Sequence, residues 1–409
     1  MRIKNLKIKN IGPFESAELN FIKNDEELQN PPVIIITGEN GSGKTILLDA
    51  IRVLLMGQFS NVEREIAAES AFTIASDIVI HSKTVAFLSN SKSGKNHFET
   101  NQVSTNVAFS KDYSIAWGNK LKTDFIFDYW TSKLSSDNFN INNITSLDTK
   151  HYLENALSGI HKNEDVAKSM TFFDYLKDSR DSREQRLGKT LYELLEKIIN
   201  ISIIDGKLSH VSRINLKPII KIHNQEISLD KLSSGNLYLI QRYTSLLRQV
   251  YAICVSNHIP IEQYASIQGV LLIDEAENHL HPKWQKVFLQ HILELFPKLQ
   301  IIVTTHSPFI VASVENAKVF VCKSQTTHSV VEEETDVFAN KPIEEILMSP
   351  LFNTNHFNEA ISELMRERKV AVAQSNQAKI AEIEKKLLKK NPEYFNYLNI
   401  EQLIQSIKK

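Results

Sequence analysis

The order of hydrophobic and polar positions predicts an α/β chain whose central strands are buried on both faces. Residues 33–36 form an unbroken run of Val and Ile, which is typical of a strand inside a parallel sheet. Residues 269–274 and 301–305 show the same apolar character. Apolar residues at helical spacing follow over 46–56 and 283–296. These segments predict a central sheet with helices packed against it.

Shorter patterned segments surround this centre. Residues 2–22 interleave apolar and polar positions and predict a β-hairpin, and residues 72–130 predict a β-rich region. Residues 148–202 show helical spacing and mixed charge, without the sustained heptads of a coiled-coil arm. We expect a helix over 234–257 and further helices from about residue 341 to the end.

These segments predict a mixed central sheet with an inserted lobe and a terminal tail. Residues 1–130 carry the N-terminal part of the core and a β-rich subdomain, and residues 131–230 form a mainly helical insertion lobe. Residues 231–325 complete the core, where 317–323 is the expected closing strand of the sheet. Residues 326–409 form a helical tail.

Composition narrows the classes of function. Charged residues make up 23% of the chain but the formal net charge is −1, so a DNA contact would need a local basic patch. The apolar runs are too short to span a bilayer and the first ten residues lack a signal-peptide core, which predicts a soluble intracellular protein with no membrane partner. Cys254 and Cys322 lie in apolar contexts, which predicts buried thiols.

The first motif that carries clear chemistry reads GENGSGKT and runs from Gly38 to Thr45, between a buried strand and a helix. Its glycines let backbone N–H groups close around phosphates, and the helix N-terminus adds its dipole. The Lys44 ammonium would reach the β- and γ-phosphates of ATP, and the Thr45 hydroxyl would bind Mg²⁺. The alternative is a chance Gly-rich turn. We predict ATP contacts from Gly38, Asn40, Gly41, Ser42, Gly43, Lys44, Thr45 and Ile46.

The second motif, LLIDE, ends the apolar run of residues 271–275. A carboxylate at the carboxyl end of a buried parallel strand lies at the edge of the sheet where ligands bind. We predict that Asp274 binds Mg²⁺ and that Glu275 orients or deprotonates the attacking water. Many strands end in a solvated acid, but the combination with the first motif favours a P-loop nucleotide hydrolase.

Two further segments resemble motifs of ABC ATPases. In LSSGN, Ser233 and Gly235 match the serine and second glycine of the signature motif, whereas Ser234 and Asn236 depart from it. The resemblance implies that Ser233 binds the γ-phosphate held by a second protomer, and therefore a homodimer or higher even oligomer that closes on ATP. His306, in TTHSP, resembles the switch histidine of this family. A serine N-cap and a buried core histidine are the alternatives.

The stretch AENHLHP, after the acidic motif, resembles the dimer-contacting loop of ABC ATPases. Its His279 and His281 have no third metal ligand at a convincing spacing, so a metal site there is disfavoured. ABC ATPases also use a glutamine that contacts Mg²⁺, for which Gln58 and Gln102 are the candidates.

The opening IKNLKIKNIGPFESAELNF and the phrases DEAENHLHP and TTHSPF are similar to RecF, SMC and OLD-type ATPases. The resemblance covers most of residues 1–325. OLD nucleases add an acidic metal site after the ATPase, whereas residues 307–409 contain one aspartate, Asp336, so we expect no nuclease within this chain.

Residues 154–170, the SSG turn and residues 343–352 together resemble the PtuA ATPases of Septu-type and retron-associated antiphage systems. The resemblance implies a partner HNH nuclease of the PtuB type, regulated by ATP, with nucleic acid reached through the complex. We assign residues 341–409 to partner binding, with packing on the ATPase lobe as the alternative. Other readings of the whole chain are a RecF-like repair ATPase that binds DNA directly, a transporter motor, and a nucleotide-sensing scaffold with little turnover.

Overall fold

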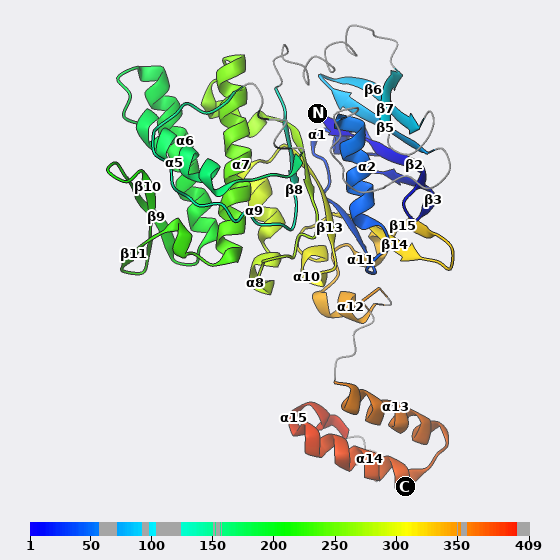
Figure 1. The fold of residues 1–409 in the computed structure, drawn as a ribbon. Coiled ribbons are helices and arrows are strands. Elements are labelled where there is room, and N and C mark those ends of the chain that lie inside the picture. Colours follow the sequence, from blue (N-terminus) through cyan, green and yellow to red (C-terminus); the bar gives the residue numbers. More distant parts are fainter. Residues whose placement is uncertain are drawn as a thin grey trace. The chain divides into compact units, whose positions relative to one another are not determined.

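The computed structural model describes residues 1–56, 72–91, 98–103, 124–149, 152, 156, 158–349, 351–352 and 358–398. The chain divides into two compact units, Met1–Ile343 and Glu344–Lys409. Both are drawn in Figure 1. Among the described residues, no helix has the length and apolar character needed to cross a membrane.

The core of the first unit is an extended sheet whose neighbouring strands are parallel except for the last pair, β14 and β15. From one edge to the other the strands are β15 (Ser329–Glu333), β14 (Lys318–Ser324), β4 (Ile34–Gly38), β13 (Leu299–Thr305), β12 (Gly269–Ile273) and β8 (Ile126–Trp130). All residues of β4, β12 and β13 are buried, which explains the apolar runs that these strands contain. Because these three strands are parallel, their carboxyl ends meet at one edge of the sheet.

An antiparallel sheet forms a second layer (Figure 1). Its strands are β1 (Arg2–Ile3), β2 (Asn5–Ile11), β3 (Phe14–Asn20), β5 (Thr73–Ile80), β6 (Lys83–Ser91) and β7 (Phe98–Val103). Helix α2 (Lys44–Met56) shares one apolar core with this sheet and with the central sheet, where Leu47 and Leu54 of the helix join Ile34 and Ile302 of the strands. The helix that starts at the phosphate motif is therefore held between two sheets. The short helix α1 (Asp25–Gln29) follows β3.

Helices and a small sheet make up the other side of the first unit (Figure 1). Helices α5 (Asn163–Leu176) and α6 (Ser182–Ser202) pack together, and α6 also packs on α7 (Ser234–Asn257). The helix predicted over 234–257 is confirmed. The small antiparallel sheet contains β9 (Gly206–Ser212), β10 (Lys217–Ile222) and β11 (Gln225–Ser228), followed by the 3₁₀ turn η2 (Leu229–Lys231).

Three details differ from the sequence-based expectations. The helix expected over 283–296 is divided into α8 (Pro282–Gln285) and α9 (Phe288–Leu295). Strand β8 joins the central sheet, because it pairs with β12 rather than with the β-rich layer. The sheet does not close at 317–323, because a turn returns the chain as β15 against β14. The remaining short elements of this unit are η3 (Ile261–Ser266), α10 (Pro308–Val311) and α11 (Thr335–Phe338).

The second unit is helical and begins at Glu344, later than the expected tail boundary at residue 326, because β15 belongs to the sheet. Helix α12 (Ile343–Met348) starts at this boundary. Helices α13 (Glu359–Ala373), α14 (Gln377–Lys390) and α15 (Pro392–Phe395) share a small apolar core of their own. Its buried members are Ile361, Ala371, Ile383, Leu387, Phe395 and Leu398.

Candidate functional site

The GENGSGKT loop connects the end of β4 to the start of α2. It lies at the edge of the central sheet where the carboxyl ends of the parallel strands meet. Gly38 has a φ of 145°, and a Cβ there would lie 2.2 Å from the Cys322 carbonyl oxygen. Gly43 has a φ of 98°, and a Cβ there would lie 2.5 Å from the Phe14 ring. Both positions therefore require glycine. Among the described residues, a Cβ on Gly41 would meet nothing within 4 Å, so that side of the loop is open.

The polar groups of the loop suit an anion. The Lys44 ammonium lies over the loop and donates to the carbonyl oxygens of Gly38, at 3.0 Å, and Glu39, at 2.8 Å. Burial lowers the pKa of Lys44, and the nearby Cys322 thiol and the acids beyond it oppose this shift. The Ser42 hydroxyl is buried and has no hydrogen-bond partner among the described residues. These donors fit a phosphate chain better than a closed structural turn.

The Thr45 hydroxyl and the Asp274 carboxylate lie side by side. Thr45 Oγ1 donates to Asp274 Oδ1 at 2.9 Å, across 229 residues of sequence. Thr304 Oγ1, at the end of β13, donates to the same oxygen at 2.7 Å. A hydroxyl beside a carboxylate oxygen is the donor set that Mg²⁺ takes in nucleotide sites. The residues present therefore fit the predicted cation.

Glu275 follows Asp274 in a left-handed backbone conformation, with a φ of 53°. This conformation is uncommon outside glycine, and neighbouring contacts hold it. The Glu275 N–H donates to Thr304 Oγ1 at 2.9 Å, and the Asn278 side-chain amide donates to Glu275 Oε2 at 2.6 Å. No hydrogen bond to Oε1 is present among the described residues. One carboxylate oxygen is thus fixed while the other is available.

His306 follows β13, next to the phosphate loop. Burial lowers the pKa of His306, the Lys44 charge lowers it further, and the charges of Glu277 and Glu275 and a backbone hydrogen bond with Gly38 oppose the shift. The net shift favours the neutral form of the ring. Glu277 fixes this segment, because its Oε1 accepts from the His306 N–H at 2.7 Å and its Oε2 from Thr305 Oγ1 at 2.6 Å.

The Ser233 hydroxyl caps the N-terminus of α7. It accepts from the Asn236 N–H at 3.3 Å and donates to Asn236 Oδ1 at 2.6 Å, and the residue is exposed. A Cβ on Gly235 would lie 2.5 Å from the His279 carbonyl oxygen, so glycine lets the helix approach the loop after β12. The serine N-cap is therefore present. The first turn of the helix still carries N–H groups that suit an anion.

Among the other predicted residues, His281 caps α8 by accepting from the Lys283 N–H at 3.2 Å, and His279 binds the Ser132 carbonyl oxygen. Within the described residues, no cluster of three or more His, Cys, Asp or Glu side chains could hold a metal. Gln58 lies outside the described residues, and for Gln102 only its backbone in β7 is described.

The prediction of buried thiols is confirmed, because Cys254 and Cys322 are free and buried. Burial raises the pKa of both to about 12. Cys322 is the cysteine whose carbonyl oxygen faces Gly38 of the phosphate loop.

Sequence reasoning missed Thr304 and Glu277. Thr304 connects Asp274 to the backbone of Glu275, and Glu277 positions the segment that carries His306. Both lie inside stretches that were singled out, TTHSP and AENHLHP, but no spacing rule distinguishes a second acid that fixes a backbone from one that faces solvent.

Comparisons with known proteins identify a matching family model, similar proteins of known name and a similar solved structure. The family model described as "AAA domain, putative AbiEii toxin, Type IV TA system" matches residues 33–312. The chain is 27% identical over 316 residues to "Septu protein PtuA" of Bacillus thuringiensis, covering 76% of this chain and 72% of that protein. It is 28% identical over 192 residues to "Retron Vc95 probable ATPase" of Vibrio cholerae serotype O1 biovar El Tor, covering 41% of this chain and 36% of that protein. The SMC head domain from Thermotoga maritima aligns with a TM-score of 0.45 and 15% identity, covering 81% of this chain and 99% of that one.

Proposed function

The chain belongs to the AAA-domain family whose model spans residues 33–312, and from that premise we propose that it binds ATP with Mg²⁺ and hydrolyses ATP to ADP and phosphate. The observation that carries the proposal is the 2.9 Å hydrogen bond between Thr45 and Asp274. It brings a hydroxyl and a carboxylate that suit Mg²⁺ to the end of the phosphate loop. Phosphate release by the purified chain tests this, and no release above an EDTA control would contradict it.

Nucleotide binding depends on the GENGSGKT loop and on the neighbouring pair of Thr45 and Asp274. The backbone N–H groups of residues 38–46, the Lys44 ammonium and the Ser42 hydroxyl would hold the phosphates. Thr45 and Asp274 would hold Mg²⁺, which would supply positive charge opposite the phosphate oxygens. The phosphates would bind on the open side of the loop, at Gly41.

The chemical step rests on Glu275 and His306. Glu275 Oε1, which has no hydrogen bond among the described residues, would accept the proton of the attacking water, while Asn278 and Thr304 keep the carboxylate and its backbone in place. The His306 imidazole would exchange its hydrogen bond with the Gly38 backbone for one that it donates to the γ-phosphate. Glu277 holds His306 in place by accepting a hydrogen bond from its backbone N–H.

We propose that Ser233 acts on the nucleotide of a second copy of this chain. Both hydrogen bonds of its hydroxyl, among the described residues, go to Asn236 in its own turn, and the residue is exposed. The start of a long helix is thus presented at the surface, where a phosphate of another protomer can reach it. The active form is therefore a dimer that closes on ATP.

Mixing two inactive variants tests this arrangement. Lys44→Ala disables the phosphate loop and Ser233→Arg blocks the helix start, so each homodimer loses both sites. A mixed dimer keeps one intact site, and random pairing should restore roughly a quarter of the wild-type rate of phosphate release. Ser266→Arg, at the exposed last residue of η3, is the matched control and should keep full turnover. No recovery in dimers shown to be mixed would contradict action across the interface.

The similarity to PtuA supports a more specific role. We propose that the chain is the ATPase subunit of an antiphage defence complex and regulates a partner nuclease of the HNH type. The second unit is the proposed docking element, because it has its own apolar core and still exposes apolar side chains. Val370 and Val372 of α13 are each 50% exposed, and Tyr394 of α15 is 52% exposed. Such side chains commonly contact a partner.

Deleting residues from 355 onward is expected to leave ATP hydrolysis intact and to abolish co-purification of the HNH nuclease. The reason is that this deletion removes α13 to α15, whose core is separate from that of the first unit. The full-length variant Val370→Lys with Val372→Lys controls for folding, because both positions are exposed. If either variant still retains the nuclease at wild-type yield, the docking surface lies elsewhere.

A further inference from the structure

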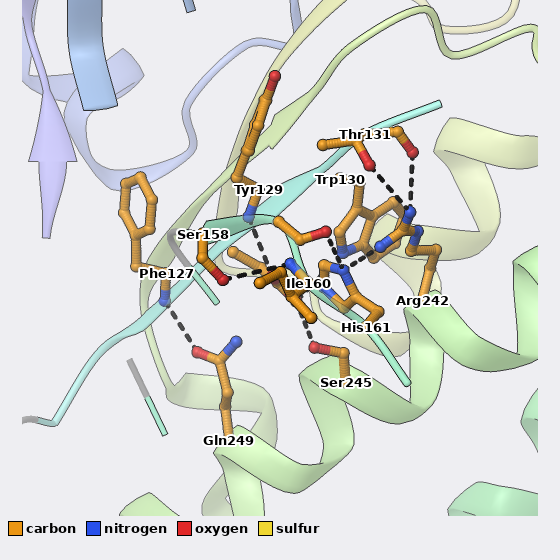
Figure 2. Close-up of polar contacts among 12 residues, drawn as sticks. Phe127, Tyr129, Trp130, Thr131, Ser158, Ile160, His161, Arg242, Ser245 and Gln249 are labelled. Carbon is orange, nitrogen blue, oxygen red and sulfur yellow. Dashed lines mark hydrogen bonds and ion pairs between the residues drawn. The ribbon is translucent and has the colours of Figure 1, made fainter. Parts of the chain in front are cut away.

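The segment after β8, residues 131–133, offers successive backbone carbonyls to two different elements. Arg242 of α7 donates from Nη2 to the carbonyl oxygens of Thr131, at 2.8 Å, and Lys133, at 2.9 Å. Between them, the Ser132 carbonyl oxygen lies 2.7 Å from His279 Nε2 and accepts from it. Figure 2 shows Arg242 meeting Thr131. One short segment therefore connects the helix that begins after Ser233 to the loop that follows Glu275.

Arg242 is held in one orientation by a buried network (Figure 2). Its side chain is fully buried, and Nη1 donates to His161 Nδ1. The same Nδ1 also lies 3.2 Å from the Gly159 carbonyl oxygen, so the His161 ring is held between Arg242 and the backbone of Gly159. Its Nε2 lies 2.9 Å from Asp128 Oδ1 on β8, and Asp128 Oδ2 accepts from Ser245 Oγ on α7 at 2.6 Å. Because the planar Arg242 guanidinium makes all these contacts at once, it fixes the distance between α7 and the end of β8.

The same elements meet again at the first turn of α7. The missing Cβ of Gly235 lets that turn approach the His279 carbonyl oxygen, and the Tyr238 ring lies 5.7 Å from the His279 ring, centroid to centroid. His279 adopts a left-handed φ of 64° to make these contacts. On the other side, the Asp274 N–H donates to the Trp130 carbonyl oxygen at 2.8 Å, directly before the segment.

We propose that Arg242 and His279 are positioning residues for ATP hydrolysis, which bridge through the carbonyls of residues 131–133 and hold the first turn of α7 in register with Asp274 and Glu275. The inference rests on the proposed ATPase function. The first turn of α7 serves the nucleotide of the second protomer, and the two acids serve the nucleotide of their own chain. The contacts of Arg242 and His279 with residues 131–133, here called the bridge, therefore make the first turn of α7 and the two acids of one protomer move together.

The bridge predicts a loss of turnover without a loss of binding. A displacement of about 1 Å at a reacting group costs on the order of 100-fold in rate. Arg242→Lys keeps a charge but cannot reach both carbonyls and His161, and His279→Asn tolerates the left-handed backbone but cannot span to Ser132. Each should lower kcat by at least about tenfold and leave KM for ATP within about twofold, because the phosphate loop is untouched.

Arg248→Gln is the matched control. Arg248 lies on the same helix and pairs with Asp165 at 2.9 Å, and among the described residues it has no hydrogen bond to residues 131–133, so kcat should stay at the wild-type value. A purely structural role of Arg242 would lower the melting temperature while sparing kcat per folded molecule. Wild-type kcat in both Arg242→Lys and His279→Asn would overturn the proposal.

Hydrogen exchange in the nucleotide-free chain separates this proposal from the ATPase proposal. Amides 237–240, where the backbone hydrogen bonds of α7 begin, should exchange roughly tenfold faster in Arg242→Lys and in His279→Asn than in the wild type or Arg248→Gln. If the wild type releases no phosphate, the ATPase proposal fails, and faster exchange still supports the bridge. Unchanged exchange in both variants overturns the bridge whether or not ATP is hydrolysed.

Discussion

Lys44→Ala is expected to reduce ATP turnover by on the order of 100- to 1000-fold, because it removes the charge placed against the β- and γ-phosphates. The Lys44 ammonium lies within 3.0 Å of two loop carbonyls, Gly38 and Glu39, and only 6% of the residue is exposed. No other cation lies on this loop among the described residues. Steady-state phosphate release and titration with a fluorescent ATP analogue measure the two parts of the effect.

Lys7→Ala is the control for Lys44→Ala. Lys7 is an exposed lysine of β2 that pairs with Glu18 at 3.0 Å, and its loss should leave both measurements unchanged. Thermal unfolding of each variant establishes that any loss of turnover is not a loss of folded protein. Turnover of Lys44→Ala within about threefold of the wild type would show that the loop does not hold the reacting phosphates.

Local patterns predicted the strands and turns that carry the site. The apolar runs placed β4, β12 and β13, and the GENGSGKT loop lies between β4 and α2 as the motif requires. These features depend on residues close together in sequence. Burial on both faces of a parallel sheet leaves a continuous apolar run that can be read without knowing the neighbouring strands.

Contacts between distant segments could not be predicted in this way. Arg242 meets Thr131 across 111 residues, and Thr304 meets Asp274 across 30. An arginine in the middle of a helix looks the same in sequence whether it faces solvent or a backbone carbonyl. Strand β8 shows the same limit, because its pattern fits a buried strand in either sheet, and only its pairing with β12 decides.

Glu275→Gln is expected to slow hydrolysis by on the order of 100- to 1000-fold while ATP binding persists, because glutamine keeps the shape but cannot accept a proton. The amide can still accept from Asn278 through its own oxygen. The bound nucleotide would then remain intact, and light scattering should show the dimer accumulating in ATP and Mg²⁺. Glu294→Gln makes the same change on an exposed face of α9 and should behave as the wild type.

The choice of Glu275 over its neighbour follows from the hydrogen bonds that each acid already makes. Both oxygens of Glu277 are engaged, one by the His306 N–H and one by the Thr305 hydroxyl, so proton uptake there would break the turn that carries His306. Glu275 uses only Oε2, in its contact with Asn278, among the described residues. Glu277→Gln should therefore disturb nucleotide affinity and turnover together. Wild-type hydrolysis by Glu275→Gln would instead show that another group takes the proton of the attacking water.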